Sequence, residues 1–268
     1  MKLTFPGQQS GKMIGTIAII IISLTSVIWL QKSRLNPNKE SLSKAEYQKQ
    51  EQLEKLQLTI YKGLPSLGFN NLLADWFYLR FIQYFGDGEA RGETGYSLSP
   101  DYFELVVDKD PRFVDANLKL SVSTSIFAGQ PKQSVAYLEQ SLKETPSKLI
   151  SPVYPPYYLW IYKGIDELLF LGDTDAAIES NKMAANWAET YPDEASQQTA
   201  VRRRETVKFL ENNPQSKVAQ IGAWTQVLSG ANDQKTQERA LAEIKALGGE
   251  IIINPDGTAR IRVPEGIE

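Results

Sequence analysis

The chain has 268 residues, a net charge of −3 and ordinary apolar (42%) and charged (23%) fractions, so one large or two small domains fit its length. The weak negative charge argues against a nucleic-acid binder. The absence of cysteine and histidine excludes disulfides, thiolate nucleophiles, Cys-ligated zinc and every catalytic triad or dyad built on histidine. We therefore assign no catalytic, cofactor-binding or metal-binding residue. An enzyme would have to use carboxylates, Lys, Tyr or an oxygen-ligated metal.

Residues 13–30 form an apolar segment without a charge, bracketed by Lys12 and Lys32. Its length is near the lower limit for a spanning helix, and Trp29 lies where an interfacial aromatic is expected. A buried core helix would keep a polar face, and a cleaved signal peptide would have a shorter apolar core and an A-x-A-like site. The pattern therefore predicts an uncleaved transmembrane anchor, with the lipid bilayer as its partner, after a tail at 1–12.

The orientation of this predicted anchor is not decided by charge, because both flanks carry a similar number of lysines and arginines. A short basic tail before an apolar run is typical of a signal anchor. We therefore expect a single-pass membrane protein whose C-terminal domain lies on the non-cytoplasmic side, periplasmic or lumenal.

A polar linker at 31–41 leads into a helix that we expect from Ser43 to about Tyr61. Ser43 and Glu46 have the spacing of a capping box. The apolar residues of this helix have spacings of three and four and form one stripe: Leu42, Leu53, Leu56 and Ile60. The stripe favours an amphipathic first helix of the main domain, 42–249. A stalk or partner-binding coiled coil is the alternative, for which the apolar repeat is short.

The next helix is expected from Asn70 or Asn71 to Gly86 and is dominated by aromatic side chains: Phe69, Trp76, Phe77, Tyr78, Phe81, Tyr84 and Phe85. Each aromatic can bury roughly 150–250 Å², which predicts a central core helix. Asp75 and Arg80 are candidate buried polar residues in it. They lie about 140° apart around the helix, so each needs another partner or solvent. They form either a polar functional site or ion pairs with neighbouring helices.

Beyond a Gly-rich segment expected as a loop at 87–99, Gly and Pro residues divide the chain into further helices. These are expected near 102–107, 112–128, 131–144, 158–171, 175–191, 193–212, 215–229 and 233–247. Helix, Gly turn, helix and Pro is the order of a helix-turn-helix repeat. Arg202, Arg203 and Arg204 splay around their helix and are expected on a solvated face.

The pattern resembles the tetratricopeptide repeat family over roughly residues 70–192. In one unit the turn is Gly129 and the closing proline is Pro146, with serines at the small-residue positions, 134 and 141. The next unit, LGDTDAAIESNKMAANWAETYP, places five residues at motif spacing: Gly172, Asp173, Ala177, Ile178 and Ala184. Pro192 departs by coming three residues late, and Gly164 is one residue away from the usual glycine. The first unit, 70–111, keeps only the final Asp-Pro.

The stretch LGFNNLLADWFYLRFIQYFGD is also similar to the opening hairpin of bacterial, notably cyanobacterial, membrane-anchored repeat proteins. The resemblance implies a mainly α fold, a helical-hairpin repeat or α-solenoid. In that family the ligand-facing residues lie on the first helix of each pair. This implies four candidate partner-binding residues, Lys119, Ser123, Tyr162 and Asp166.

The end of the chain changes character at 250–264, where two short apolar runs flank Pro255-Asp256-Gly257. This pattern predicts a β-hairpin, which must pack on the helical domain or pair with another chain, because an isolated hairpin is marginal in water.

The function expected from these features is that of a membrane-anchored, non-enzymatic scaffold that binds a protein or peptide partner in the assembly of a membrane complex. One alternative is a carboxylate-based, glycosidase-like enzyme that uses Asp75 with Asp166 or Glu167 in an open cleft. Another is a purely structural subunit of a membrane complex, which would expose a large apolar patch on the isolated chain.

Overall fold

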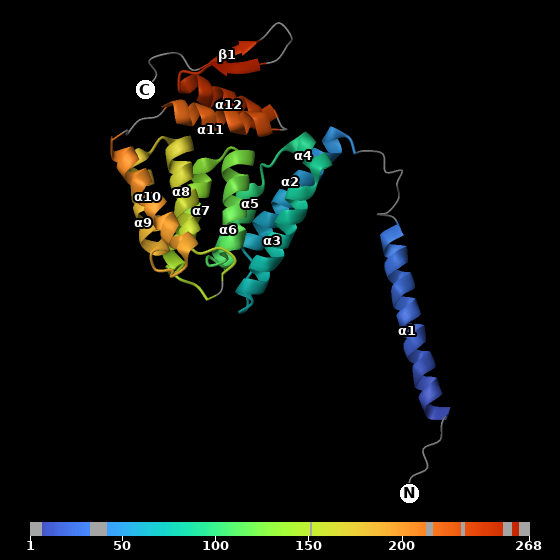
Figure 1. The fold of residues 1–268 in the computed structure, drawn as a ribbon. Helices are drawn as coiled ribbons and strands as arrows, with labels where there is room; N and C mark the ends of the chain where they lie inside the picture. Colours follow the sequence, from blue (N-terminus) through green and yellow to red (C-terminus); the bar gives the residue numbers. More distant parts are fainter. Residues whose placement is uncertain are drawn as a thin grey trace. The chain divides into compact units, whose positions relative to one another are not determined.

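The computed structural model describes residues 7–32, 42–150, 152–212, 217–231, 234–253 and 259–262. The chain divides into two compact units, Met1–Leu42 and Ser43–Glu268. The first contains α1, Gly7–Lys32, and the second contains all other elements (Figure 1). The expected linker at 31–41 overlaps the last two residues of α1, and the rest of it, 33–41, lies outside the described residues.

Helix α1 exposes every side chain described in it, residues 15–28, including a run of isoleucines from Ile19 to Ile22. Its hydroxyl groups bond to its own backbone: Thr25 Oγ1 donates to Ile21 O and Ser26 Oγ donates to Ile22 O, each at 2.7 Å. Across the described part of the chain, no helix combines the length and apolar character that crossing a membrane requires. The structure therefore gives no support to the expected anchor at 13–30, of which only residues 15–28 have described side chains.

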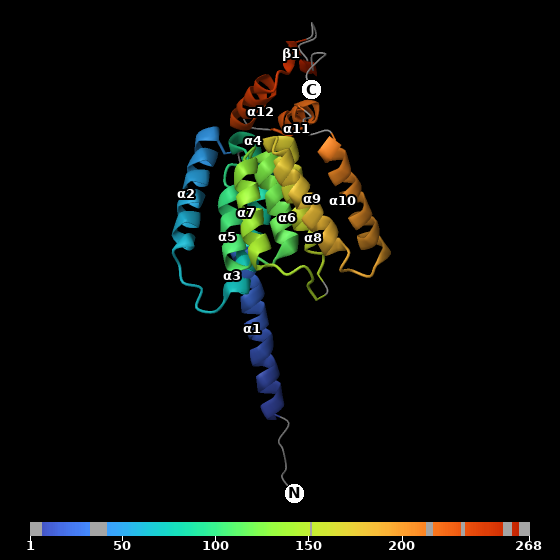
Figure 2. The same ribbon diagram turned by 90° about the vertical axis from the view of Figure 1, so that its left-hand side faces the viewer.

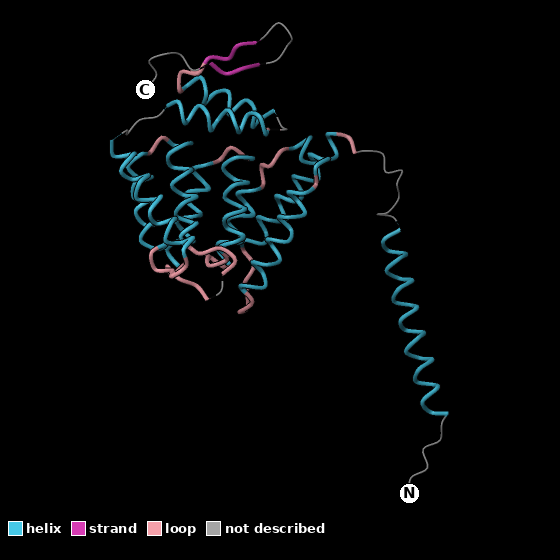
Figure 3. The backbone as a smooth tube through the Cα atoms, viewed as in Figure 1, coloured by secondary structure: helices cyan, strands magenta, loops and turns pink. Residues whose placement is uncertain are grey.

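The second unit is built almost entirely of helices, which confirms the expected mainly helical fold (Figure 3). Its α-helices are α2 Lys44–Lys62, α3 Asn70–Gly86, α4 Gly88–Thr94, α5 Ser99–Lys109, α6 Val114–Val122, α7 Pro131–Glu144, α8 Tyr157–Ile165, α9 Thr174–Ala188, α10 Glu194–Asn212, α11 Lys217–Gly230 and α12 Gln234–Ala246. Two π-helical segments follow α6 and α8 without a break: η1 Ser123–Phe127 and η2 Asp166–Leu171. Helices α5 to α10 lie side by side, and α11 and α12 cross one end of the array (Figures 1 and 2).

Local sequence explains where the first helices begin. The Ser43 amide donates to Glu46 Oε2 at 2.8 Å and the Glu46 amide to Ser43 Oγ at 3.4 Å, which confirms the capping box of α2. Helix α3 begins at Asn70, as expected, and Phe69 at its cap position makes no side-chain hydrogen bond to the first turn. The loop expected at 87–99 contains α4, which begins where the Asp87 carboxylate accepts from the Ala90 amide.

Helix α3 forms the core with α5, as its aromatic content predicts. Phe77, Phe81 and Tyr84 are buried on α3. The Tyr102 ring of α5 lies 5.9 Å from the Phe81 ring and 5.4 Å from the Tyr84 ring, within the range for favourable aromatic pairs. The remaining aromatic residues of α3 are less buried, and Trp76 is among the exposed ones.

Two helix pairs, α6–η1 with α7 and α8–η2 with α9, share one construction. Each first helix turns at a glycine with positive φ, Gly129 or Gly172. Eight residues earlier each has a small residue at the contact between the paired helices. Ser121 O accepts from Ser134 Oγ at 3.3 Å, and a Cβ on Gly164 would lie 3.2 Å from the Ser180 Cβ. The π-helical segment between the small residue and the glycine widens the last turn of each helix.

The last helices and strands complete the second unit. The three arginines of α10 have different partners, Thr199 for Arg202, Asn181 for Arg203 and Glu189 for Arg204, so they form no basic cluster. Helices α11 and α12 bury Trp224, Val227 and Ile244 together with Phe170 of η2. Strands β1 Glu250–Ile253 and β2 Ala259–Arg262 pair antiparallel, with Ile251 opposite Ile261. The turn expected at 255–257 lies outside the described residues.

Candidate functional site

Helix α2 is oriented against its own hydrophobic pattern. Tyr47, Glu51, Glu54 and Leu58, at spacings of four, three and four, turn toward the rest of the unit. The expected apolar stripe points the other way: Leu53, Leu56 and Ile60 are 52%, 57% and 54% exposed. At 3.6 residues per turn this stripe lies roughly 160° around the helix from the inward residues. The expectation of an ordinary amphipathic helix with these residues as its packing spine is therefore wrong.

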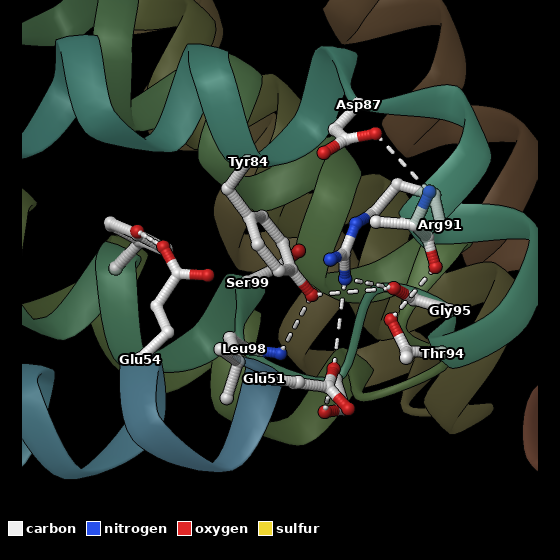
Figure 4. A network of polar contacts seen from close by, with 12 residues as sticks. Glu51, Glu54, Tyr84, Asp87, Arg91, Thr94, Gly95, Leu98 and Ser99 are labelled. Atoms are coloured by element: carbon white, nitrogen blue, oxygen red, sulfur yellow. Dashed lines mark hydrogen bonds and ion pairs between the residues drawn. The ribbon is translucent and has the colours of Figure 1, made fainter. Parts of the chain in front are cut away.

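Arg91 of α4 is the first inward partner of α2. The residue is 4% exposed, and its guanidinium lies 3.8 Å from the centroid of the Tyr84 ring and 3.6 Å from the Glu51 carboxylate (Figure 4). Arg91 Nη1 also donates to Gly95 O. The hydroxyl of the same Tyr84 accepts a hydrogen bond from the Leu98 amide at 3.1 Å. A buried charge is thus held by an opposite charge, an aromatic face and a carbonyl.

Glu54 makes the next contact, one helical turn along α2. Its carboxylate accepts from the Tyr102 hydroxyl and lies 3.8 Å from Arg80 of α3. Burial, together with this hydrogen bond to Glu54, raises the pKa of Tyr102, so the phenol stays protonated and donating. Arg80 Nη2 also donates to Gln57 at 3.2 Å. Arg80 therefore joins α2 to α3.

Lys62 fixes the carboxyl end of α2. Its ammonium lies 2.7 Å from Glu104 and 3.0 Å from Asp101, both on α5. Burial by itself would lower the pKa of Lys62, but the hydrogen bonds to Glu104 and Asp101 outweigh it and raise the pKa. Lys62 is consequently charged at neutral pH, and its two ion pairs hold α2 to α5 throughout the physiological pH range.

These contacts explain why α2 does not rotate to bury its leucines. Rotation would remove the carboxylate of Glu51 from Arg91, and an uncompensated buried charge costs about 3–5 kcal/mol. It would also separate Glu54 from Tyr102 and Lys62 from its two acids. Burying three leucine-sized side chains gains roughly 1.5–3 kcal/mol each, so several ionic and hydrogen-bonded contacts must act together to hold the observed orientation.

The exposed stripe of α2 continues onto α3. We call the exposed large apolar side chains of these two helices and the turn between them the outer apolar face: Leu53, Leu56, Ile60, Leu64, Leu67, Phe69, Leu72, Trp76, Leu79 and Ile82. Tyr61 and Trp76, whose rings are 5.1 Å apart, connect its two halves. Each residue is roughly half exposed, so the face presents on the order of 1,000 Å², well above the few hundred Å² usual for a monomer.

The residues expected to bind a partner do not share a groove. Lys119 is exposed and its Nζ donates to Asp115 at 2.6 Å, and Tyr162 is half-buried against the core. Ser123 is 1% exposed, with its Oγ 2.7 Å from Ser99 Oγ. Asp166 is also buried. The expectation is therefore corrected for Ser123 and Asp166, because the wider π-helical turns in which they lie are packed inside the unit.

The two candidate buried polar residues of α3 also differ. Asp75 is exposed, so the expectation of a buried carboxylate there is wrong. Arg80 is half-buried and finds its partners on the neighbouring helix, as one of the two alternatives anticipated. Its guanidinium also lies 5.3 Å from the Trp76 ring.

The carboxylates proposed for an enzyme lie in closed surroundings. Glu167 is buried and accepts from Ser180 Oγ at 2.6 Å and from Lys163. Burial raises the pKa of Asp166 to about 7, while hydrogen bonds with Ser134 and Ser125 oppose this rise. In the described part of the chain no group of three or more acidic residues is arranged to hold a metal ion.

A cleft of about 730 Å³ lies between the two hairpin turns and helices α11 and α12. Phe170 and Trp224 line it, with rings 5.3 Å apart, and Lys132 and Glu243 contribute charge. Arg239 also lines the cleft, but its guanidinium is bonded to the carbonyls of Ala128 and Gly129. The charged groups of the cleft thus have mixed sign, and one of them, Arg239, already holds α12 to the turn at Gly129.

Sequence reasoning missed Glu51, Glu54 and Arg91. The signal was present, because 47, 51, 54 and 58 form as good a helical stripe as the leucines do. Three of those four residues are polar or charged, however, and hydrophobic periodicity does not register them. Arg91 belongs to the segment that the sequence predicts to be a loop, whereas the structure places it in α4.

No family model matches the chain, and neither a curated protein nor a solved structure shows significant similarity.

Proposed function

We propose that this protein is a membrane-anchored, tetratricopeptide-repeat-like scaffold that binds a protein partner through the outer apolar face, as a subunit of a membrane assembly. The observation that carries this proposal is the inverted orientation of α2. Ionic and hydrogen-bonded contacts hold the helix so that its leucines face outward, and a surface of this size and apolarity is typical of an interface. A large exposed patch is also what the structural-subunit alternative leads one to expect.

The repeat-like part of the proposal is supported by the two similar helix pairs. The one-residue displacement of Gly164 from the repeat motif coincides with η2, whose π-helical turn adds a residue before Gly172. Ser121 and Gly164 stand at the same distance from their turns and both contact the paired helix. The two helix pairs are thus variants of one pattern with the same insertion.

The anchoring part of the proposal is supported by α1, whose described side chains form no polar face. Thr25 and Ser26 satisfy their hydroxyls on the helix itself, as a lipid environment requires. We place the second unit on the non-cytoplasmic side of a bacterial membrane. Protease accessibility tests this placement in sealed vesicles whose outer surface is the non-cytoplasmic side of the membrane. Digestion of the second unit in intact vesicles is expected, and digestion only after the vesicles are opened would contradict the placement.

The partner-binding role is tested with single cysteines, because the natural chain has none. Leu56→Cys in the full chain should react slowly with N-ethylmaleimide in native membranes and rapidly after denaturation. Glu205→Cys on the exposed surface of α10 is the matched control and should react at similar rates in both conditions. Equal, rapid labelling of Leu56→Cys in native membranes would show that nothing covers the face, and the proposal would fail.

A further inference from the structure

We propose that the occupant of the outer apolar face is a second copy of this chain, packed antiparallel so that α2 lies on α2 and α3 on α3. This inference rests on the proposed function, since it names the partner that the face receives. It makes the second unit a symmetric dimer whose interface is the α2–α3 hairpin.

The area of the face suits such a dimer. A standard stable interface buries about 800 Å² on each partner, and the outer apolar face presents on the order of 1,000 Å². A twofold interface uses the same patch on both subunits, so it must be self-complementary. A continuous apolar surface on two adjacent helices meets that condition, because leucines and isoleucines can interdigitate with their own copies.

The levels of the two helices locate the twofold axis. Arg80 contacts Gln57 and Tyr61 contacts Trp76, so Leu56 of α2 and Leu79 of α3 lie at about the same height on neighbouring helices. An axis that crosses both helices at this height places Leu56 opposite its own copy and Leu79 opposite its own copy. All ten side chains of the face then contribute to one interface.

Charge on the face favours the antiparallel arrangement. Lys49 lies near the amino end of α2, where Glu46 is already bonded to the Ser43 cap, and Asp75 lies nearer the turn between α2 and α3. Reversal of one copy brings Lys49 to the end of the interface where the second copy has Asp75. A parallel stacking of α2 on α2 would instead oppose Lys49 with Lys49. Like charges placed directly opposite each other are unfavourable, so the antiparallel arrangement is selected.

Disulfide formation between single cysteines in the full, detergent-solubilised chain tests the geometry. Leu56→Cys and Leu79→Cys, placed at the axis, should each form a covalent dimer on mild oxidation. Lys49→Cys lies on the same stripe, seven residues from Leu56. At 1.5 Å per residue its two copies would be about 20 Å apart, too far for a disulfide. Lys49→Cys should therefore form no covalent dimer under the same oxidation.

Light scattering after size exclusion then tests the energetics. The natural chain should have the mass of a dimer, and the double variant Leu56→Glu, Leu79→Glu should dissociate at least tenfold more readily. Both residues are exposed within one chain, so the helical circular dichroism should not change. A monomeric natural chain, a dimer that persists in the double variant, or equal crosslinking of Lys49→Cys and Leu56→Cys would overturn the inference.

The failure of this inference is distinguishable from that of the proposed function. If the chain is monomeric and Leu56→Cys is still protected in native membranes, a different protein or the lipid surface covers the face. The second copy is then excluded, and a covering protein, identified by crosslinking from Leu56→Cys, would leave the scaffold role intact. If Leu56→Cys is fully reactive in membranes, both proposals fail.

Discussion

The Glu51 carboxylate lies 3.6 Å from the Arg91 guanidinium, and this ion pair joins α2 to a part of the chain forty residues away. Both side chains are largely shielded from water, 17% and 5% exposed. The pair therefore differs from a surface salt bridge, because the loss of one partner leaves the other charge in a poorly hydrated position. It is the contact on which the orientation of α2 most directly depends.

We predict that Glu51→Gln lowers the free energy of unfolding by about 2–4 kcal/mol, somewhat less than for a fully buried pair because Arg91 keeps Tyr84 and Gly95 as partners. Chemical denaturation followed by circular dichroism measures this. Glu211→Gln removes the exposed partner of Lys182 and should change stability by less than about 0.5 kcal/mol. Equal effects of the two substitutions would contradict a special role for the Glu51–Arg91 pair.

Tyr84→Phe tests the hydroxyl in the same network. The Leu98 amide is buried and donates to this hydroxyl, so its removal leaves a buried donor without its partner. We expect a loss of about 1–3 kcal/mol in unfolding free energy, with no change in helical content. Tyr154→Phe is the control, because Tyr154 is 42% exposed, and it should be nearly neutral. A neutral Tyr84→Phe would mean that the amide finds another acceptor.

Asp166 predicts a pH dependence of stability. Burial raises its pKa from 3.8 to about 7 in the folded chain, so the folded state holds the proton more tightly than the unfolded state does. The contribution of this group is most favourable below about pH 4 and declines as pH rises from 4 to 7, after which it is constant. Asp166→Asn cannot ionise and should lose this decline.

The measurement for Asp166 is unfolding free energy at pH 4 and pH 8. We expect Asp166→Asn to be relatively more stable at pH 8 than at pH 4, by on the order of 2–4 kcal/mol compared with the natural chain. Asp75→Asn changes an exposed carboxylate and should leave the pH profile unaltered. An unchanged profile in Asp166→Asn would show that Asp166 is ionised in the folded protein at neutral pH or that its burial has no energetic cost.

Gly164 tests the close packing of α8 on α9. An added Cβ would meet Ser180 Cβ and Asn181 Nδ2 at 3.2 Å, whereas an added Cβ on Gly92 of α4 would meet no atom within 4 Å. Glycine inside a helix normally costs about 1 kcal/mol relative to alanine, so Gly92→Ala should stabilise the protein by that amount. Gly164→Ala should lose this gain, and Gly164→Leu should destabilise by about 1–3 kcal/mol. Thermal unfolding would compare the three variants, and a gain from Gly164→Ala equal to that from Gly92→Ala would contradict the packing argument.

Much of the local structure could be predicted from the sequence. The Ser43–Glu46 cap, the aromatic helix that ends at Gly86 and the turns at Gly129 and Gly172 all depend on residues close together in the chain. A capping hydroxyl or a residue with positive φ acts over three or four positions, so its pattern is visible without the fold. The small residues Ala177 and Ala184, at the spacing of the repeat motif, are likewise both buried in the structure.

The tertiary structure alone decided which face of α2 is buried. Hydrophobic periodicity gives the direction of the apolar stripe but carries no information about Arg91, Tyr102 or Glu104, which lie far along the chain. The ion pairs and hydrogen bonds of Glu51, Glu54 and Lys62 with those distant residues outweigh the burial of three leucine-sized side chains. The same is true of Ser123 and Asp166, whose burial follows from π-helical turns that packing stabilises. The sequence by itself therefore determined most of the helices and several of their ends, whereas long-range electrostatic contacts determined which face of α2 is left exposed.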